Sequence, residues 1–316
     1  MIEPAPAEQV VDYGRFDFQG LWTGRERVSE VERTIVGDAL EATDRRRLLE
    51  IGTGFGRLLP TLAQLGREVV ATDLDVDALA QLPPSVAPPR VLRVAANLYH
   101  LPFVEGAFTG ATLVRVHHHL LNPIGALREI GRVLTKGASL VVSYQPTPSI
   151  GTVVGDLQRA LARNGSGRLP FVTFARGEVI LPVRPFPIRS VGRKRFREEA
   201  QEAGFRSVRE IGASFEELAP LRRFRAESFV RVGTLFGRAP AFPTRFMVVT
   251  RNGGPCGTFP DTADILACPK CKAPRPKWSR GEPPECDRCS FVGQRHRSVL
   301  DLRYFPPGTR RWGVEA

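Results

Sequence analysis

The chain has 316 residues, of which 42% are hydrophobic, and a formal net charge of +12. Its apolar runs fall well short of the roughly 20 residues that a membrane-spanning helix needs, which argues against a membrane protein. The first residues lack the basic and apolar regions of a signal peptide. We therefore expect a globular protein that resides in the cytoplasm.

The positive charge is concentrated in the second half of the chain. Residues 1–150 contain 15 Lys and Arg against 17 Asp and Glu, whereas residues 151–316 contain 30 against 16. Such an excess is typical of a protein with an acidic partner, for example a nucleic acid. Only five of the 45 basic residues are Lys, so a coding bias toward Arg is the alternative explanation.

Apolar periodicity predicts strands that alternate with helices along the first 144 residues. This alternation is typical of a doubly wound, Rossmann-like α/β fold, in which helices cover both faces of a parallel sheet. The expected helices are 26–43, a segment ending near residue 65, 76–82 and 125–134, and the expected strands are 47–51, 67–73, 90–96, 111–116 and 139–144.

The rest of the chain has a less regular pattern. Residues 145–190 are rich in Pro, Gly and Arg, which favours a lid or substrate wall, with a connector as the alternative. A helix over 193–205 is expected to end at Gly204, and strands are expected over 206–213 and 244–250. The predicted organisation is a catalytic domain over 1–252, a linker over 253–260, a small cysteine-containing domain over 261–305 and a tail over 306–316.

Three glycines, Gly52, Gly54 and Gly56, follow a predicted strand that ends in Glu50 and Ile51. Their G-x-G-x-G spacing differs from the G-x-G-x-x-G of dinucleotide sites, and no Lys follows as in a triphosphate-binding loop. An acid at the strand end would repel a pyrophosphate. It suits the positively charged sulfonium and ammonium groups of S-adenosylmethionine.

Asp73 ends the next predicted strand, 21 residues after Gly52. An acid at this place can accept hydrogen bonds from both ribose hydroxyls of a nucleotide. NAD sites share this feature, and a loop acid or a helix cap is the alternative. Together with the glycine turn, Asp73 indicates a cofactor that contains a nucleoside.

Residues 95–108 contain the motif "LPF", and residues 114–144 contain "HHL", a Pro and "RVL". These motifs resemble the class I methyltransferases, in particular the methyltransferase type 11 proteins of ubiquinone and menaquinone biosynthesis. The resemblance extends over about residues 12–252. It implies that the cofactor is S-adenosylmethionine and that the reaction is methyl transfer.

The resemblance also implies roles for single residues. Glu50, Gly52 and Gly54 would face the methionine part of the cofactor, Asp73 its ribose and Leu74 its adenine, and Gly56 would also belong to the cofactor site. Asn97 stands where the family usually has an Asp that accepts from the adenine amino group, and an Asn carbonyl can accept the same bond. Leu98 would offer its backbone N–H beside the adenine.

His118 and His119 are the candidate general bases, with His117 beside them at the end of the fourth predicted strand. Imidazole titrates near neutral pH and suits proton transfer, whereas packing against the cofactor or the next helix is the alternative role. Tyr13 and Tyr144 are weaker candidates for contact with substrate or cofactor. No Cys lies in the catalytic half, which argues against a covalent route through a Cys nucleophile.

Cys268, Cys271, Cys286 and Cys289 form two C-x2-C pairs separated by 14 residues. Four thiolates on two tight turns match a closed, structural zinc site, which leaves no open position for catalysis. Neither pair is followed by the glycine that is common in such turns. Four unliganded thiols or an iron–sulfur cluster are the alternatives, and Cys256 is interpreted as a spare thiol.

The segment 261–305 resembles the small zinc-ribbon activator subunits of tRNA, rRNA and release-factor methyltransferases. With the basic second half, this suggests RNA or a translation-related macromolecule as the methyl acceptor. The alternatives are a small-molecule methyltransferase with a structural ribbon and a non-catalytic binding protein. Residues expected to contact RNA are Arg193, Arg195, Arg197, Arg222 and Arg223, with Lys270, Lys272, Arg275 and Lys277 in the ribbon. Trp278 would stack on a base or, as the alternative, fill the ribbon as a hydrophobic plug.

Overall fold

In the computed structural model of the protein, the described strands form one large sheet and one two-stranded sheet. Among the described residues, no helix is long and apolar enough to cross a membrane. The described residues are 8–12, 16–41, 43–147, 178–181, 188–214, 224–239, 242–255, 262–274 and 284–312.

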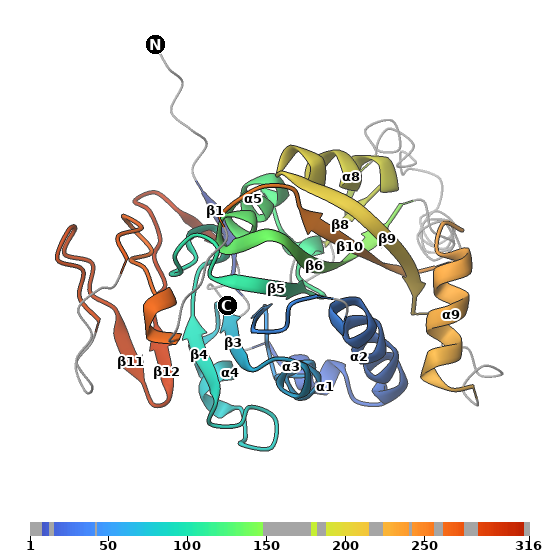
Figure 1. Ribbon diagram of the computed structural model, residues 1–316, viewed down its shortest axis with the longest axis horizontal. Helices are drawn as coiled ribbons and strands as arrows, with labels where there is room; N and C mark the ends of the chain where they lie inside the picture. The colour runs from blue at the N-terminus through green and yellow to red at the C-terminus, as the bar shows by residue number, and fades with distance from the viewer. Residues whose placement is uncertain are drawn as a thin grey trace, which may run out of the picture.

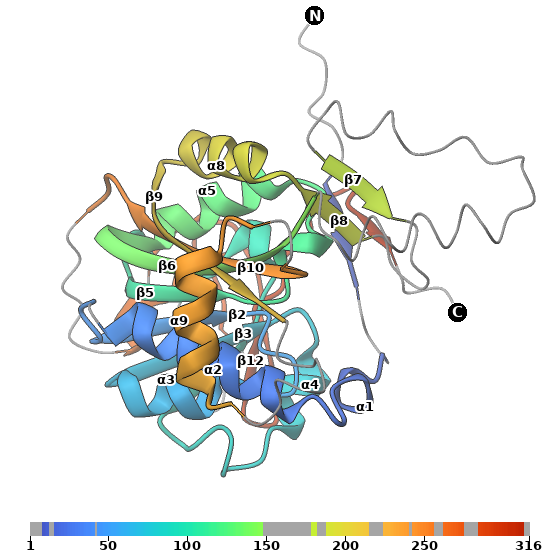
Figure 2. The same cartoon turned by 90° about the vertical axis from the view of Figure 1, so that its right-hand side faces the viewer.

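Seven strands of the larger sheet follow the order β4-β3-β2-β5-β6-β10-β9 (Figures 1 and 2). All neighbouring pairs are parallel except those of β10, which runs antiparallel to both β6 and β9. The strands are β2 (Arg47–Ile51), β3 (Glu68–Asp73), β4 (Val91–Ala95), β5 (Phe108–Leu113), β6 (Leu134–Pro146), β9 (Phe205–Ala213) and β10 (Thr244–Arg251).

Helices cover both faces of this sheet, as Figures 1 and 2 show. Both β2 and β5 are buried along their whole length, as expected for central strands of a parallel sheet. One apolar core contains residues of α5 (Pro123–Val133) and α8 (Arg193–Glu202). The other contains residues of α2 (Glu26–Glu41), α3 (Leu59–Leu65), α4 (Val76–Gln81) and α9 (Ala226–Phe236).

The predicted doubly wound α/β fold is therefore confirmed, with differences in single elements. The strand predicted over 111–116 lies at 108–113, because Phe108 and Thr109 are buried in the sheet and Arg115 adopts a left-handed φ of 63°. Elements that the pattern did not reveal are α1 (Phe18–Leu21), α9, β1 (Gln9–Val11), β7 (Glu178–Leu181), β8 (Ile188–Val191) and the short 3-10 helices η1 (Leu98–His100) and η2 (His117–His119).

The C-terminal part of the chain extends the sheet. Strand β12 (Val299–Asp301) pairs in parallel with β4 and antiparallel with β11 (Gln294–His296). Strand β13 (Arg310–Trp312) then pairs in parallel with β1, so that the two ends of the described chain lie together. We call residues 262–274 and 284–312 the cysteine module. Most of the predicted lid over 145–190 and linker over 253–260 lies outside the described residues.

Candidate functional site

The glycine turn follows β2 at the carboxyl edge of the sheet. Gly52, Gly54 and Gly56 all have positive φ, of 75°, 51° and 80°. A Cβ on Gly52 would lie 2.2 Å from the Val116 side chain, and one on Gly56 would lie 2.4 Å from Val86. Gly52 and Gly56 therefore meet both a conformational and a steric requirement, whereas the requirement at Gly54 is conformational only.

Asp73 at the end of β3 lies against this turn, as the sequence predicts. Its carboxylate accepts from the backbone N–H of Gly54 at 2.7 Å and from that of Asp75 at 3.0 Å. Burial raises the pKa of the Asp73 carboxyl above its usual value. The helix cap is supplied by Asp75 instead, which accepts from the N–H groups of Asp77 and Ala78 at the start of α4.

Glu50 is a buried acid beneath the turn, with 3% of its surface exposed. Burial raises the pKa of its carboxyl to about 8, although the nearby Arg57 charge opposes this shift. Its hydrogen-bond partner is the hydroxyl of Thr53, at 3.3 Å. A buried acid with so little compensation suits a ligand that brings positive charge.

A buried ion cluster beside the turn was not predicted. The fully buried Glu32 of α2 pairs with Arg57 and Arg115, each at 2.5 Å. The Arg57 guanidinium stacks over Trp22 at 3.9 Å from the ring centroid. Its buried Nη1 has no hydrogen-bond partner among the described residues. The signal in the sequence is Glu32 itself, an acid on the apolar face of α2 next to Val31.

The residues predicted to contact the adenine are hydrogen-bonded to the C-terminal segment of the chain. The buried Asn97 donates its amide hydrogens to Glu8 Oε1 at 2.8 Å and to the carbonyl of Tyr304 at 3.0 Å. Its Oδ1 accepts from the backbone of Tyr99, which leaves one lone pair for a ligand. Arg303 donates to the carbonyl of Leu74 at 3.1 Å. Sequence spacing gave no sign of these long-range contacts.

The carboxyl ends of the neighbouring strands β2, β3 and β4 lie at one edge of the sheet. This edge brings together Glu50, the three glycines, Asp73, Leu74 and Asn97. Residues 49–142 match the methyltransferase domain family.

Two curated methyltransferases are similar to this chain in sequence. The demethylmenaquinone methyltransferase of Mycolicibacterium gilvum is 31% identical over 119 residues, which are 38% of this chain and 50% of that protein. Its counterpart in Mycolicibacterium paratuberculosis is 32% identical over 135 residues, which are 42% of this chain and 57% of that protein. The chain thus spans about half the length of the curated relatives it matches.

A solved structure supports the fold. The S-adenosylmethionine dependent methyltransferase from Mesorhizobium loti aligns with a TM-score of 0.50 and 15% identity, over 70% of this chain and 98% of that chain. At this identity the likeness concerns the fold alone.

Three consecutive histidines lie in η2, which is separated from β5 by three residues. His117 is fully buried between Phe196 and Tyr144, 3.8 Å from the Glu199 carboxylate, and burial lowers its pKa. His118 is 7% exposed and its ring lies 3.9 Å from that of His119. Burial, followed by the charges of its neighbours, lowers the pKa of His118 well below the usual value. This lowered pKa makes the His118 imidazole a weaker proton acceptor than a free histidine.

Tyr144 of β6 has a structural role at the centre of the sheet. Its ring stacks on Phe196 with 4.4 Å between centroids, and its hydroxyl donates to Glu210 at 3.1 Å. Burial raises the pKa of this phenol. Tyr13 lies outside the described residues.

The four cysteines of the module come together. The sulfur of Cys268 lies 3.5 Å from that of Cys289, that of Cys271 lies 3.5 Å from that of Cys286, and all four lie within 4.8 Å of one another. A zinc ion about 2.3 Å from each sulfur requires sulfurs about 3.8 Å apart in a tetrahedron. The donor set therefore fits a single metal ion of this kind. Cys256 lies outside the described residues.

Both cysteine turns have the same geometry despite their missing glycines. Lys272 and Ser290 adopt the left-handed φ values of 59° and 55° that glycine would favour. Their N–H groups donate to the carbonyls of Cys268 and Cys286, each at 2.9 Å. Lys272 also reaches the methyltransferase domain, where its Nζ donates to Glu129 at 2.7 Å. One residue thus closes a turn and attaches the module to α5.

The arginines of α8 are engaged by acids. Arg193 forms an ion pair with Glu210, and Arg197 lies 3.8 Å from the same carboxylate. Arg195 pairs with the buried Glu199 at 3.1 Å. Arg222, Arg223, Arg275, Lys277 and Trp278 lie outside the described residues.

Proposed function

We propose that this chain transfers a methyl group from S-adenosylmethionine to an RNA acceptor. The observation that carries the methyl-transfer part is the contact between Asp73 and the Gly54 N–H, at the carboxyl edge of a sheet segment that matches the methyltransferase domain. In open α/β sheets, ligands bind at this edge.

Two buried groups suit S-adenosylmethionine in particular. Glu50 is a buried acid whose pKa burial raises to about 8, and the ammonium of the methionine part would compensate its charge. Arg57 has a buried Nη1 without a partner, and the methionine carboxylate is an acceptor of the required charge. A pyrophosphate would bring no compensating charge to Glu50, because a negative ligand disfavours the carboxylate form.

When bound, this cofactor supplies an electrophilic methyl group activated by its sulfonium. The protein then has to align the acceptor and exclude water. His118 and His119 follow β5 beside the glycine turn, and their placement supports a role in taking up the proton of an acceptor that must be deprotonated. An acceptor with an already ionised nucleophile would need no such base.

The charge of the cysteine module supports an RNA acceptor. Five of its basic side chains are exposed and form no ion pair among the described residues: Lys270, Arg288, Arg295, Arg297 and Arg310. Unpaired cations can contact phosphates without first breaking an internal pair. The α8 arginines belong to the same proposal but contribute less, because acids already hold them.

The four-cysteine site is proposed to bind one structural zinc ion. Four sulfurs complete a closed tetrahedral set, so the ion would stabilise the module and leave the methyl transfer to the domain over 1–252.

The relatives favour a second candidate. Two proteins that match this chain are named demethylmenaquinone methyltransferases, so a small-molecule acceptor is the alternative to RNA.

One experiment separates these proposals. Purified protein is incubated with methyl-labelled S-adenosylmethionine and, in parallel, with total RNA, total protein and a small-molecule and lipid extract. Label in the RNA fraction supports the proposal. Label only in the extract replaces RNA by a small acceptor, and no label with any fraction, in protein that binds the cofactor, contradicts methyl transfer to these classes.

A further inference from the structure

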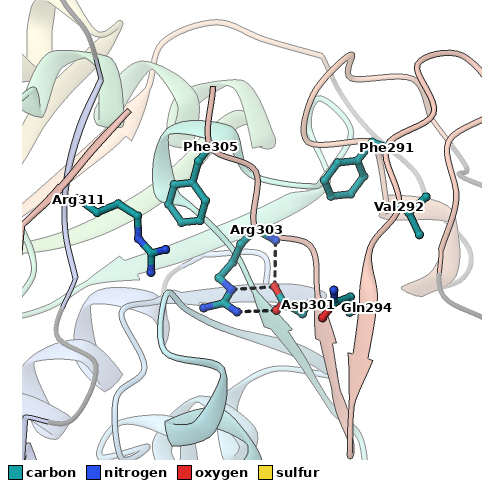
Figure 3. A pocket seen from close by; sticks show the side chains of 7 residues that line it. All are labelled: Phe291, Val292, Gln294, Asp301, Arg303, Phe305 and Arg311. Atoms are coloured by element: carbon teal, nitrogen blue, oxygen red, sulfur yellow. Dashed lines mark hydrogen bonds and ion pairs between the residues drawn. The ribbon is translucent and has the colours of Figure 1, made fainter. Parts of the chain in front are cut away.

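A hollow of about 240 Å³ lies between the second cysteine turn and the closing segment of the chain (Figure 3). It is separate from the glycine turn and from the histidines. Its lining comes from the cysteine module alone: Phe291, Val292, Gln294, Asp301, Arg303, Phe305 and Arg311.

Aromatic rings bound this hollow from two segments. Phe291 follows the second cysteine turn and Phe305 follows β12, and in Figure 3 they lie on opposite sides of the Arg303 side chain. Arg311 lies over the Phe305 ring at 4.8 Å. Both rings are partly exposed, so an apolar flat ligand would gain contact area on them.

The cation between the rings is held in a fixed orientation. Arg303 donates to both carboxylate oxygens of Asp301, at 2.8 and 2.6 Å, and to the carbonyl of Leu74 at 3.1 Å. With these donors engaged, the planar guanidinium offers mainly its face to a ligand, and arginine faces stack on aromatic groups. The lining thus favours a planar ligand over a simple anion.

The edge of the hollow carries polar groups that suit such a ligand. Gln294 is exposed and its side-chain amide can both donate and accept hydrogen bonds, as recognition of a nucleobase edge requires. Arg311 is 39% exposed although it pairs with Asp12, so its remaining donors can reach a phosphate beside the base.

We propose that this hollow binds one unstacked nucleobase of a single-stranded RNA. The proposal rests on the RNA acceptor proposed above and assigns a place on the protein that holds it. Since Arg303 links the hollow to Leu74 at the end of β3, a base held here lies at the same edge of the sheet as the predicted cofactor site. The ligand would thereby be oriented relative to the reaction.

The test measures binding of fluorescein-labelled RNA octamers of A, U or C to the full-length protein by fluorescence anisotropy at low salt. Phe305→Ala and Gln294→Ala are compared with wild type, and Phe236→Ala is the matched control, because Phe236 is an exposed Phe of α9. An RNA duplex of the same length serves as a ligand without unstacked bases. Circular dichroism, zinc content and calorimetric titration with S-adenosylmethionine show whether each variant is intact.

Loss of one stacking partner is expected to weaken single-strand binding about 5- to 150-fold for Phe305→Ala. Phe305→Tyr, which keeps the ring, should restore it, and Phe236→Ala should match wild type. Equal binding by wild type and Phe305→Ala, in a protein that methylates RNA, overturns the inference alone. A loss of cofactor affinity without loss of RNA affinity also overturns it, since the hollow would then serve the cofactor. If wild type binds no RNA and methylates only small molecules, the proposed acceptor fails as well.

Discussion

The two ends of the sheet use arginine in different ways. At the β9 end, α8 and its neighbours direct arginines at the buried acids Glu199 and Glu210. At the β12 end, the cysteine module leaves arginines exposed, and its two turns place four sulfurs within 4.8 Å of one another. Positive charge in a sequence is therefore no direct measure of charge available to a partner. The acids that face each arginine decide this.

The largest expected effect comes from a substitution in the cysteine module, at the β12 end of the sheet. Cys286→Ser should abolish metal binding and unfold the module, because metal-binding free energy is folding free energy in such small sites, about 10–16 kcal/mol in zinc-finger peptides. Zinc analysis and limited proteolysis would measure both changes. Val292→Ala, an exposed site in the same module, is the control. Zinc-free protein with a protease-resistant module would contradict the zinc proposal.

A second variant removes the ion pairs of a buried acid at the β9 end of the sheet. Glu210 is buried and faces Arg193, Arg245 and Tyr144, and Arg245 is itself 6% exposed. Glu210→Ala leaves a buried charge uncompensated and should lower the free energy of unfolding by about 3–5 kcal/mol, measured by urea denaturation.

Glu202→Ala is the matched control on α8. Glu202 pairs with Arg128, and both side chains are more than half exposed, so the change should stay within about 0.5 kcal/mol. Similar losses for Glu202→Ala and Glu210→Ala would show that burial of the acid does not decide its contribution.

The sequence predicted the centre of the molecule better than its ends. Burial of β2 and β5 is visible in their continuous apolar residues, and the left-handed backbone of the turn is visible in its glycines. Both signals lie within a few residues of sequence. Strand β12 has only three residues, and its partner β4 lies about 200 positions earlier in the chain. No local pattern can specify such a pairing.

In the candidate site, too, some features could be predicted from local sequence patterns and others could not. Asp73 and the turn were each predicted to contact the cofactor, and in the structure Asp73 accepts a hydrogen bond from the Gly54 N–H of the turn. The bonds of Asn97 to Glu8 and Tyr304 depend on both ends of the chain and could not be predicted from spacing. For the α8 arginines, the helix pattern was visible, but Glu210 comes from β9, so pairing across elements was hidden.

Between the two ends, Asp73→Ala tests the predicted ribose contact. It should weaken S-adenosylmethionine binding by about 1.5–3 kcal/mol, the scale of hydrogen bonds that involve a charged group. Isothermal titration calorimetry measures this, with NADH as a ligand that should not bind. The exposed neighbour Asp77→Ala is the control. Unchanged affinity for Asp73→Ala would remove Asp73 from the cofactor site.

Glu50 predicts a pH dependence at the same site. Its folded pKa of about 8 lies above the usual 4.5, so the folded protein binds more protons than the unfolded chain between these values, and the stability of the cofactor-free protein falls as pH rises through this window. A cationic ligand favours the carboxylate. Cofactor affinity should therefore increase with pH up to about 8, by at most about tenfold per pH unit.

Calorimetric titrations from pH 6 to pH 9 measure this profile, with buffers of different ionisation enthalpy to count released protons. Glu50→Gln should flatten the profile and remove the proton release. A wild-type affinity that is independent of pH would show that Glu50 does not face the positive groups of the cofactor.

The smallest expected effect is a change in the salt dependence of RNA binding, which we compare between unpaired arginines at the β12 end and paired arginines at the β9 end. Each phosphate contact to a single strand contributes about 0.7 to the slope of log affinity against log salt. Arg295→Ala combined with Arg310→Ala should lower the slope by up to about 1.4, because both side chains are exposed and form no ion pair among the described residues. Arg193→Ala combined with Arg195→Ala should change it less, because Glu210 and Glu199 already neutralise these charges. Anisotropy titrations of single-stranded RNA from low to moderate salt measure both slopes. An equal or larger change for the α8 pair would show that RNA competes successfully with the buried acids, and would place the phosphate contacts at the β9 end.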